Sequence, residues 1–119
     1  MKAADLVLAC KDAGDDFQIH INEFIDTFRR ATEQERVALI AEGPTVPGRF
    51  EGLVAAVVSA LCREAGMPPP AWVNVVYSPE PFFVMAARGF ALRLRLMLES
   101  PPPFRSRNVF VPESYLSRA

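Results

Sequence analysis

The sequence is poor in the residues from which catalytic and metal sites are built. It contains one histidine, His20, and two cysteines, Cys10 and Cys62, which lie far apart and form no CxxC motif. Metal sites need several such ligands that converge, and none of the six glycines lies in a phosphate-binding Gly-rich motif. No serine or cysteine lies in a nucleophile motif. We therefore predict that the protein is not an enzyme and has no catalytic residue, no metal site and no cofactor.

Long apolar runs are also missing. The longest, from Leu53 to Cys62, is far shorter than the ~20 residues that a transmembrane helix needs. Asp5 interrupts the apolar start of the chain, which a signal peptide would keep free of charge. Without an export signal, the two cysteines are expected to be reduced and to pack as small apolar residues. We expect a cytoplasmic protein with no membrane partner.

The charge is nearly balanced overall but unevenly distributed along the chain. The formal net charge is −1. Residues 1–51 carry six basic and ten acidic side chains, whereas residues 84–119 carry six arginines and two glutamates. Either the two parts neutralise each other in the fold, or the basic part binds an acidic protein or a phosphate backbone.

The apolar pattern predicts a mainly α fold. With 119 residues, the chain fits a single domain, residues 1–119. The segment at about 49–65 is apolar nearly all round, which is typical of a helix surrounded by other elements, and Gly66 and Pro68 end it. We expect four to five helices around this central helix. They span about 3–13, 17–31, 33–42, 49–65 and 82–98.

The C-terminal third has the most distinctive composition. One or two very short strands are expected near 73–77 and 107–111, with an extended bend at Pro101–Pro103 between the last helix and the second strand. The inward face of the helix at about 82–98 is expected to consist of Ala86, Phe90, Leu94, Met97 and Leu98. Its opposite side carries Arg88, Arg95 and Glu99 beside leucines, and is more apolar than solubility requires.

The arginines of this region predict a surface that binds a macromolecule. Arg88 and Arg95 share one side of the helix, and Arg105 and Arg107 would point to one side if their segment is extended. Guanidinium groups bind carboxylates and phosphates, and protein interfaces favour arginine, methionine and aromatic residues. A helix-turn-helix is not supported, because the helix at 49–65 offers apolar side chains where base edges need polar ones.

The end of the chain carries a family resemblance. From Glu99 to Val111 it reads ESPPPFRSRNVFV, and YLSRA follows at 115–119. This motif resembles the C-terminal end of a family of short, poorly characterised bacterial proteins. Weaker similarity extends to residues 21–26, 61–66, 70–72 and 80–84. The resemblance implies a cognate protein of the nucleotidyltransferase-like toxin class, with this chain as the antitoxin-like or accessory member.

Together these observations predict a non-catalytic protein-binding protein. The predicted partner-binding residues are Arg88, Leu92, Arg95, Phe104, Arg105, Arg107, Asn108 and Phe110. The residues of the C-terminal motif have a second interpretation, in which they only lock the tail onto the core. The alternative function is a nucleic-acid-associated regulator that uses the same arginines, and a homodimer is also left open.

Overall fold

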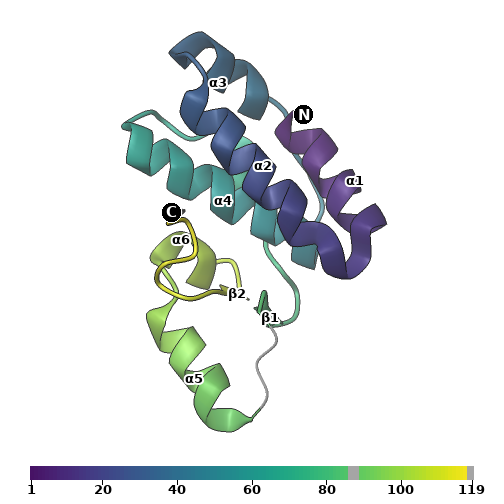
Figure 1. Cartoon of the computed structure of the whole chain (residues 1–119), viewed down its shortest axis with the longest axis vertical. Helices are drawn as coiled ribbons and strands as arrows, with labels where there is room; N and C mark the ends of the chain where they lie inside the picture. The colour runs from purple at the N-terminus through teal and green to yellow at the C-terminus, as the bar shows by residue number, and fades with distance from the viewer. Residues whose placement is uncertain (86–88, 118–119) are drawn as a thin grey trace.

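The computed structural model describes residues 1–85 and 89–117 and shows the predicted mainly α fold with two very short strands (Figure 1). The helices are α1 (Ala3–Ala13), α2 (Phe17–Arg30), α3 (Glu33–Ile40), α4 (Arg49–Ala65), α5 (Phe90–Glu99) and the single turn α6 (Pro102–Arg105). The strands are β1 (Phe82–Phe83) and β2 (Val109–Phe110), and 3₁₀ turns span Gly14–Asp16 and Ala71–Asn74. In the described ranges, no helix is both long enough and apolar enough to cross a membrane.

Helix α4 is the centre of the fold, because its sequence is apolar on almost every side. Every residue from Phe50 to Val58 is buried, and so are Leu61 and Cys62 in the following turn. Helices α1 and α2 pack against α4, and so do the Ala71–Asn74 turn, α6 and β2. The central helix predicted at about 49–65 is thereby confirmed, and Gly66 ends it in the left-handed conformation with φ 69°.

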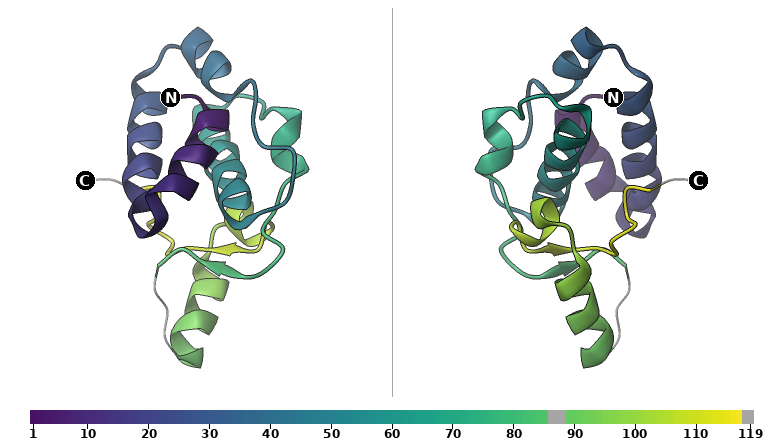
Figure 2. Two further views of the ribbon diagram at one scale, coloured as in Figure 1. Left: turned by 90° about the vertical axis from the view of Figure 1, so that its right-hand side faces the viewer. Right: turned by 90° about the vertical axis from the view of Figure 1, so that its left-hand side faces the viewer.

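Helices α1 and α2 lie side by side on α4 (Figures 1 and 2). Helix α2 is amphipathic, as its sequence predicts, and it buries one apolar face. The buried residues of that face are Ile21, Phe24, Ile25 and Phe28. Burying each of these side chains contributes about 1.5–3 kcal/mol before entropy costs. Helix α3 follows at the end of the bundle and begins with a capping box formed by Thr32 and Glu35.

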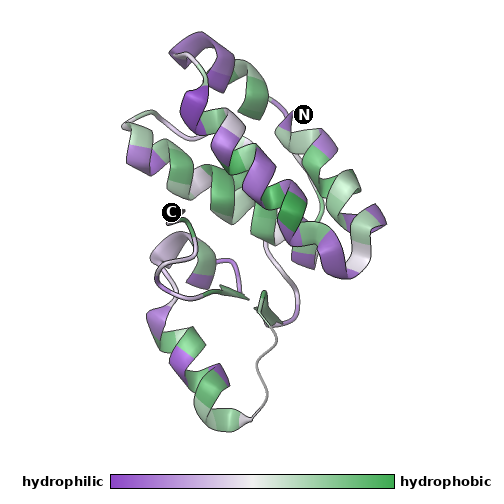
Figure 3. Cartoon of the chain, viewed as in Figure 1, coloured by the Kyte–Doolittle hydropathy of each residue, from purple (hydrophilic) through white to green (hydrophobic). Residues whose placement is uncertain are grey.

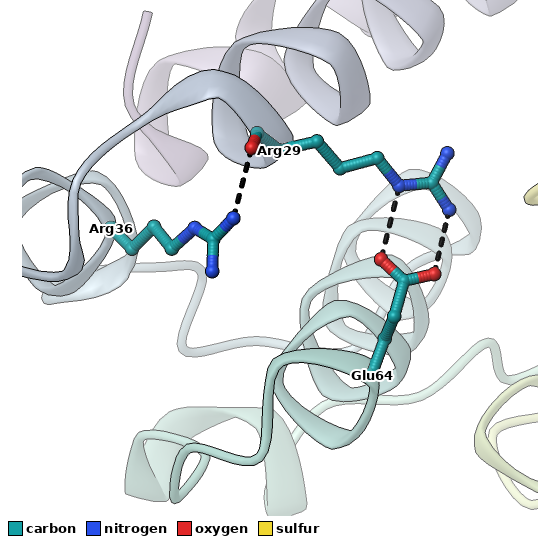
Figure 4. Close-up of polar contacts among 3 residues, drawn as sticks. All are labelled: Arg29, Arg36 and Glu64. Carbon is teal, nitrogen blue, oxygen red and sulfur yellow. Dashed lines mark hydrogen bonds and ion pairs between the residues drawn. The ribbon is translucent and has the colours of Figure 1, made fainter.

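Two arginines hold the corner between α2 and α3 against the bundle (Figure 4). The Arg36 side chain reaches back from α3 and donates hydrogen bonds to the carbonyl oxygens of Phe28 and Arg29, at 2.9 Å each. These are among the last carbonyl groups of α2, which a helix leaves without internal partners. The Arg29 side chain forms a bidentate pair with Glu64 of α4, with N–O distances of 3.0 and 2.8 Å. Arg36 therefore ties the start of α3 to the end of α2, while Ile40 at the other end of α3 is buried in the core.

The prediction of a helix at about 82–98 is wrong in its first half. Strand β1 lies where that helix was expected to begin, and it pairs in parallel with β2. Helix α5 starts only at Phe90, after Gly89, whose φ of 87° is a conformation that favours glycine. The local apolar spacing indicated a helix. Instead, the backbone of Phe82 and Phe83 pairs with β2, which is distant in the sequence.

Two other expectations for this region are also wrong. Residues 73–77, all within the described part, form no strand, because the backbone makes local 3₁₀ hydrogen bonds such as that from Val73 N to Pro70 O. The prolines at 101–103 do not make an extended bend, because proline is well tolerated in the first turn of a helix and α6 begins there. The short strand predicted near 107–111 is present as β2.

Replacing Arg36 by methionine is expected to lower the free energy of unfolding by about 1–3 kcal/mol, because the change removes two hydrogen bonds made by a charged donor. Glu64→Gln is the matched control, since it weakens only a solvent-exposed ion pair, which is worth about 0–1 kcal/mol. Urea unfolding of both variants measures the two losses. Equal losses would show that Arg36 has no special part in holding the corner.

Candidate functional site

Helix α5 projects from one end of the molecule, away from the bundle of α1, α2 and α4 (Figures 1 and 2). Its sequence, FALRLRLMLE, places apolar side chains on every side of the helix. Leu96 alone among the residues of α5, all of which are described, is buried. It packs against Phe110 and Phe83, whose ring centroids lie 5.1 Å apart. The body therefore holds α5 along one line and leaves the rest of the helix open.

The two ends of the α5 segment are fixed to consecutive residues at β2. Before α5, Val84 N donates to the carbonyl oxygen of Phe110 at 3.1 Å. After α5, the buried Ser100 hydroxyl accepts a hydrogen bond from Val111 N at 2.9 Å and donates to the carbonyl oxygen of Leu96. The sequence reasoning missed Ser100. Its signal is a serine directly after a helix, where the hydroxyl can bond back to the carbonyl four residues earlier.

An apolar stripe runs along the side of α5 that faces away from Leu96. We call these residues the outer stripe: Phe90, Ala91, Leu94, Met97 and Leu98. Phe90 is 80% exposed and Leu98 69% exposed, and Leu94 and Met97 are about 40% exposed. The prediction that this face points inward is wrong, because none of the described elements packs over it, and Ala86 lies outside the described residues. Apolar residues are prominent along α5 in Figure 3.

A groove of about 470 Å³ lies beside the outer stripe, between α5 and the segment that contains β1. Its lining is mainly apolar, with one acidic and one basic side chain. The lining residues are Glu80, Pro81, Phe83, Phe90, Arg93, Leu94 and Met97. The guanidinium of Arg93 lies over the Phe83 ring, 5.3 Å from its centroid, which orders one wall of the groove.

The other flank of α5 is charged, and we call Leu92, Arg95 and Glu99 the arginine side. Arg95 Nε donates to Glu99 Oε1 at 2.8 Å, and this hydrogen bond raises the pKa of the guanidinium. Leu92 and Arg95 are both exposed, as the prediction of docking residues requires. Arg88, predicted to lie on the same side, is outside the described residues. Arg105 is exposed on α6, just after α5 in the chain.

The aromatic residues of the C-terminal motif lie inside the fold. Phe104 is fully buried in the main core and meets the Tyr115 ring edge-on, with centroids 5.5 Å apart. Phe110 is buried beneath α5 with Leu96. Neither ring is open to a partner in this structure, so both belong to the interior and not to the predicted docking surface. This is the arrangement that the locking interpretation of the motif describes.

Two polar residues of the motif also serve this lock. Arg107 donates to the carbonyl oxygens of Val73, at 2.9 Å, and Pro103, at 2.7 Å, and burial lowers the pKa of its guanidinium. Asn108 adopts a positive φ of 63°, and its Nδ2 donates to the carbonyl oxygen of Ser78 at 3.1 Å. The segment is a helical turn followed by a tight turn and is not extended, so the expectation that Arg105 and Arg107 share one side fails.

Within the described residues, no three His, Cys, Asp or Glu side chains converge as metal ligands would. Burial raises the pKa of the Cys10 thiol to about 11 and also raises the pKa of Cys62, so both thiols are protonated at neutral pH and are poor nucleophiles. Nδ1 of the half-buried His20 has no hydrogen-bond partner within the described part.

Comparison of the chain with models of protein families, with characterised proteins and with solved structures found no match. The candidate site is therefore defined by its own geometry. It consists of an exposed helix with an apolar stripe, a groove and an arginine side.

Stability is expected to fall as the pH rises above 9. Burial raises the pKa of Cys10 from 9.0 to about 11, and burial also raises the pKa of Tyr115 above 10.0, although its hydrogen bond to Gln18 acts in the opposite direction. Between the unfolded and the folded pKa, the native state keeps the protons of Cys10 and Tyr115, whereas the unfolded state has lost them. The stabilisation from Cys10 is therefore complete below pH 9 and is lost as the pH rises to about 11, with Tyr115 extending the loss upward.

Urea unfolding at a series of pH values measures this decline. Tyr115→Phe is the control, because it keeps the ring and removes the titrating hydroxyl. Its stability should fall less steeply than that of the wild type above pH 10, the unperturbed pKa of tyrosine. Identical slopes would show that Tyr115 does not contribute.

Proposed function

We propose that this protein is a non-catalytic binding protein that docks on a partner protein through α5. The observation that carries the proposal is the exposure of the apolar side chains of α5, a fully described helix in which Leu96 is the one buried residue. Soluble proteins rarely leave a contiguous apolar patch open unless it meets another molecule. A helix that presents anchors at helical spacing is a common element of recognition.

The arginine side of α5 is the part that we assign to this partner. Leu92 offers apolar contact next to the exposed Arg95, and Arg105 follows on α6. Within the described residues, Arg95 uses its Nε for Glu99, so its two terminal amino groups can bind a carboxylate of the partner. The matching surface is an apolar patch bordered by aspartate or glutamate. Arginine at the rim of such a patch improves specificity and the rate of encounter.

The class of partner that we propose is the nucleotidyltransferase-like toxin that the resemblance of the C-terminal motif implies. In that arrangement this chain is the antitoxin-like member of a cytoplasmic pair. Inhibition proceeds by stoichiometric occlusion, in which α5 covers the partner's working surface. Occlusion requires a stable complex and no chemistry from this chain.

A nucleic-acid-binding function has weaker support. Phosphate binding needs several accessible cationic side chains, yet Arg107 is bonded inside the fold and Arg95 shares its charge with Glu99. Stacking on unpaired bases needs exposed aromatic rings, and Phe104 and Phe110 are buried. These contacts favour a protein partner over nucleic acid.

The proposal is tested by capture of partners on the tagged chain in its native host, with identification by mass spectrometry. The double variant Leu92→Glu with Arg95→Glu is expected to weaken capture of a nucleotidyltransferase-like protein by roughly tenfold or more, because it reverses the charge and places a carboxylate in an apolar contact. Val37→Glu is the matched control, since Val37 is 54% exposed on α3 at the other end of the molecule (Figure 1).

Equal capture by the double variant and the wild type would contradict the assignment of the arginine side. Capture of RNA in place of a protein, lost steeply as salt is raised, would instead support the alternative function.

A further inference from the structure

We propose that Ser100 is the positioning residue of α5, because its one buried hydroxyl both closes the end of this helix and ties that end to the residue after β2. The inference rests on the proposed function, in which α5 is the docking element, and it adds the residue that sets the direction of this helix. The hydrogen bonds of Ser100, its burial and the few other contacts of α5 carry the inference.

Helix α5 is too short to be stable without support from the body. It spans 10 residues, Phe90–Glu99, whereas an isolated helix of fewer than about 12–15 residues is marginal in water. Leu96 is the one buried residue of this fully described helix, so few of its side chains contribute tertiary packing. The helical state and the direction of α5 therefore depend on where the body holds it.

The apolar contact of α5 does not by itself set this direction. Leu96 packs against Phe110 and Phe83, and hydrophobic attraction has no preferred orientation. Arg93 lies over the Phe83 ring, but Arg93 is exposed, and a cation–π contact is weak at an exposed site. A helix held at one buried residue can pivot about that residue. A second attachment with a defined geometry is needed to fix its axis.

Ser100 supplies the second attachment, four residues after Leu96 and thus about one helical turn further along the axis. Its N–H donates to Leu96 O at 3.0 Å. Its hydroxyl oxygen lies 2.5 Å from the same Leu96 O and 3.0 Å from Val111 O, and it accepts a hydrogen bond from Val111 N at 2.9 Å. Hydrogen bonds require alignment of donor and acceptor. This one hydroxyl therefore orients the end of α5 relative to the chain that follows β2.

Burial prevents water from taking over the role of this hydroxyl. Ser100 is 2% exposed and Val111 is fully buried. Removing the hydroxyl would leave the Val111 N–H without its acceptor, and an unsatisfied buried donor costs more than the hydrogen bond contributes on balance. The end of α5 can relieve this cost by moving away from Val111 and admitting water. Loss of the hydroxyl is therefore expected to loosen α5.

The rest of the fold is expected to tolerate this loosening. Leu96 and Phe110 form a small apolar cluster of their own, separate from the main core around α4. Stability is not uniform across a protein, and a unit with few buried contacts opens at a lower free energy than the core. Loss of the Ser100 hydroxyl should therefore act on α5 and leave α4 protected.

The direction of α5 is what links Ser100 to docking. Ser100 is buried and is not one of the residues that we assign to the partner, which are Leu92, Arg95 and Arg105. It acts through the helix that presents the first two of them. A binding element that is already in place loses less entropy when it binds. A looser α5 should therefore bind more weakly, although every docking residue is unchanged.

Hydrogen exchange followed by NMR at each residue tests the hold of Ser100 on α5. In Ser100→Ala, the amides from Leu94 to Glu99 should exchange about tenfold faster or more, because the change removes a buried hydrogen bond and leaves its donor unsatisfied. The amides from Leu53 to Cys62 in α4 should keep their wild-type rates. Ser78→Ala is the matched control, since Ser78 is 1% exposed and its hydroxyl donates to the carbonyl oxygen of Glu80, outside α5. It should leave the exchange of α5 unchanged.

Four results of this experiment would overturn the proposal. Wild-type α5 amides that exchange as fast as those of an unstructured chain would show that there is no hold to lose. Unchanged α5 rates in Ser100→Ala would show that the hydroxyl does not contribute to the hold. Equal acceleration in α4 and α5 would show that Ser100 supports the fold as a whole. Equal acceleration of α5 in Ser78→Ala would show that the effect is not specific to position 100.

Capture of partners on the tagged chain, measured as for the proposed function, connects the position of α5 to docking. Ser100→Ala should capture roughly two- to tenfold less of the nucleotidyltransferase-like protein than the wild type or Ser78→Ala, because a smaller fraction of the chain is ready to bind. A loosened α5 with undiminished capture would overturn the role of Ser100 in docking and leave the proposed function standing. Capture of no such protein by the wild type would contradict the proposed function, and the exchange rates alone would then decide whether Ser100 positions α5.

Discussion

Helix α4 is apolar on almost every side, so the rest of the chain has to enclose it. The enclosure is close. A Cβ atom at Gly52 would lie 2.6 Å from Ser78 N, because the backbone that follows the Ala71–Asn74 turn runs directly over α4. Helices α1 and α2 cover another part of its surface, and α6 and β2 a third. Helix α5 lies beyond these elements, at one end of the molecule (Figure 1).

The lock at the C-terminus supports α5, the helix that we propose as the docking element. The motif residues that were candidates for a docking surface, Phe104, Arg107 and Asn108, instead fasten the tail to the core. Phe110 extends this fastening to α5 through Leu96. A helix that is to bind a partner with little loss of entropy has to be held in place beforehand. The buried motif provides that support. We therefore attribute its distinctive composition to holding α5 in place and not to binding a partner.

The elements that could be predicted from the sequence are those whose signals are local. Gly66 and the apolar run before it define α4, and the spacing of apolar residues in α2 defines its buried face. The apolar spacing over 90–98 correctly indicated a helix there, but periodicity does not say which side of that helix meets the rest of the fold. Whether Phe90 and Leu94 are buried or exposed depends on where the other elements pack in the folded protein. A short stretch of sequence does not contain that information.

The parts that sequence reasoning missed depend on pairs of residues that are distant in the chain. Strand β1 exists because its backbone bonds to β2, more than twenty residues later. Ser100 matters because the chain returns to it at Val111. The buried state of Arg107 follows from the carbonyl group of Val73. In each case the sequence shows the residue type but does not show the distant group to which it is hydrogen-bonded.

The anchoring of Val84 and Ser100 to consecutive residues of the chain has a consequence for how this protein could change. The segment between them leaves the body and returns to it at nearly one place, and Leu96 is the one buried side chain among the described residues between these anchors. Lengthening such a loop costs little, since the entropy of closure grows only with the logarithm of its length. A different helix grafted between the same two anchors would replace the exposed side chains of α5, while the anchoring hydrogen bonds to Phe110 and Val111 could remain.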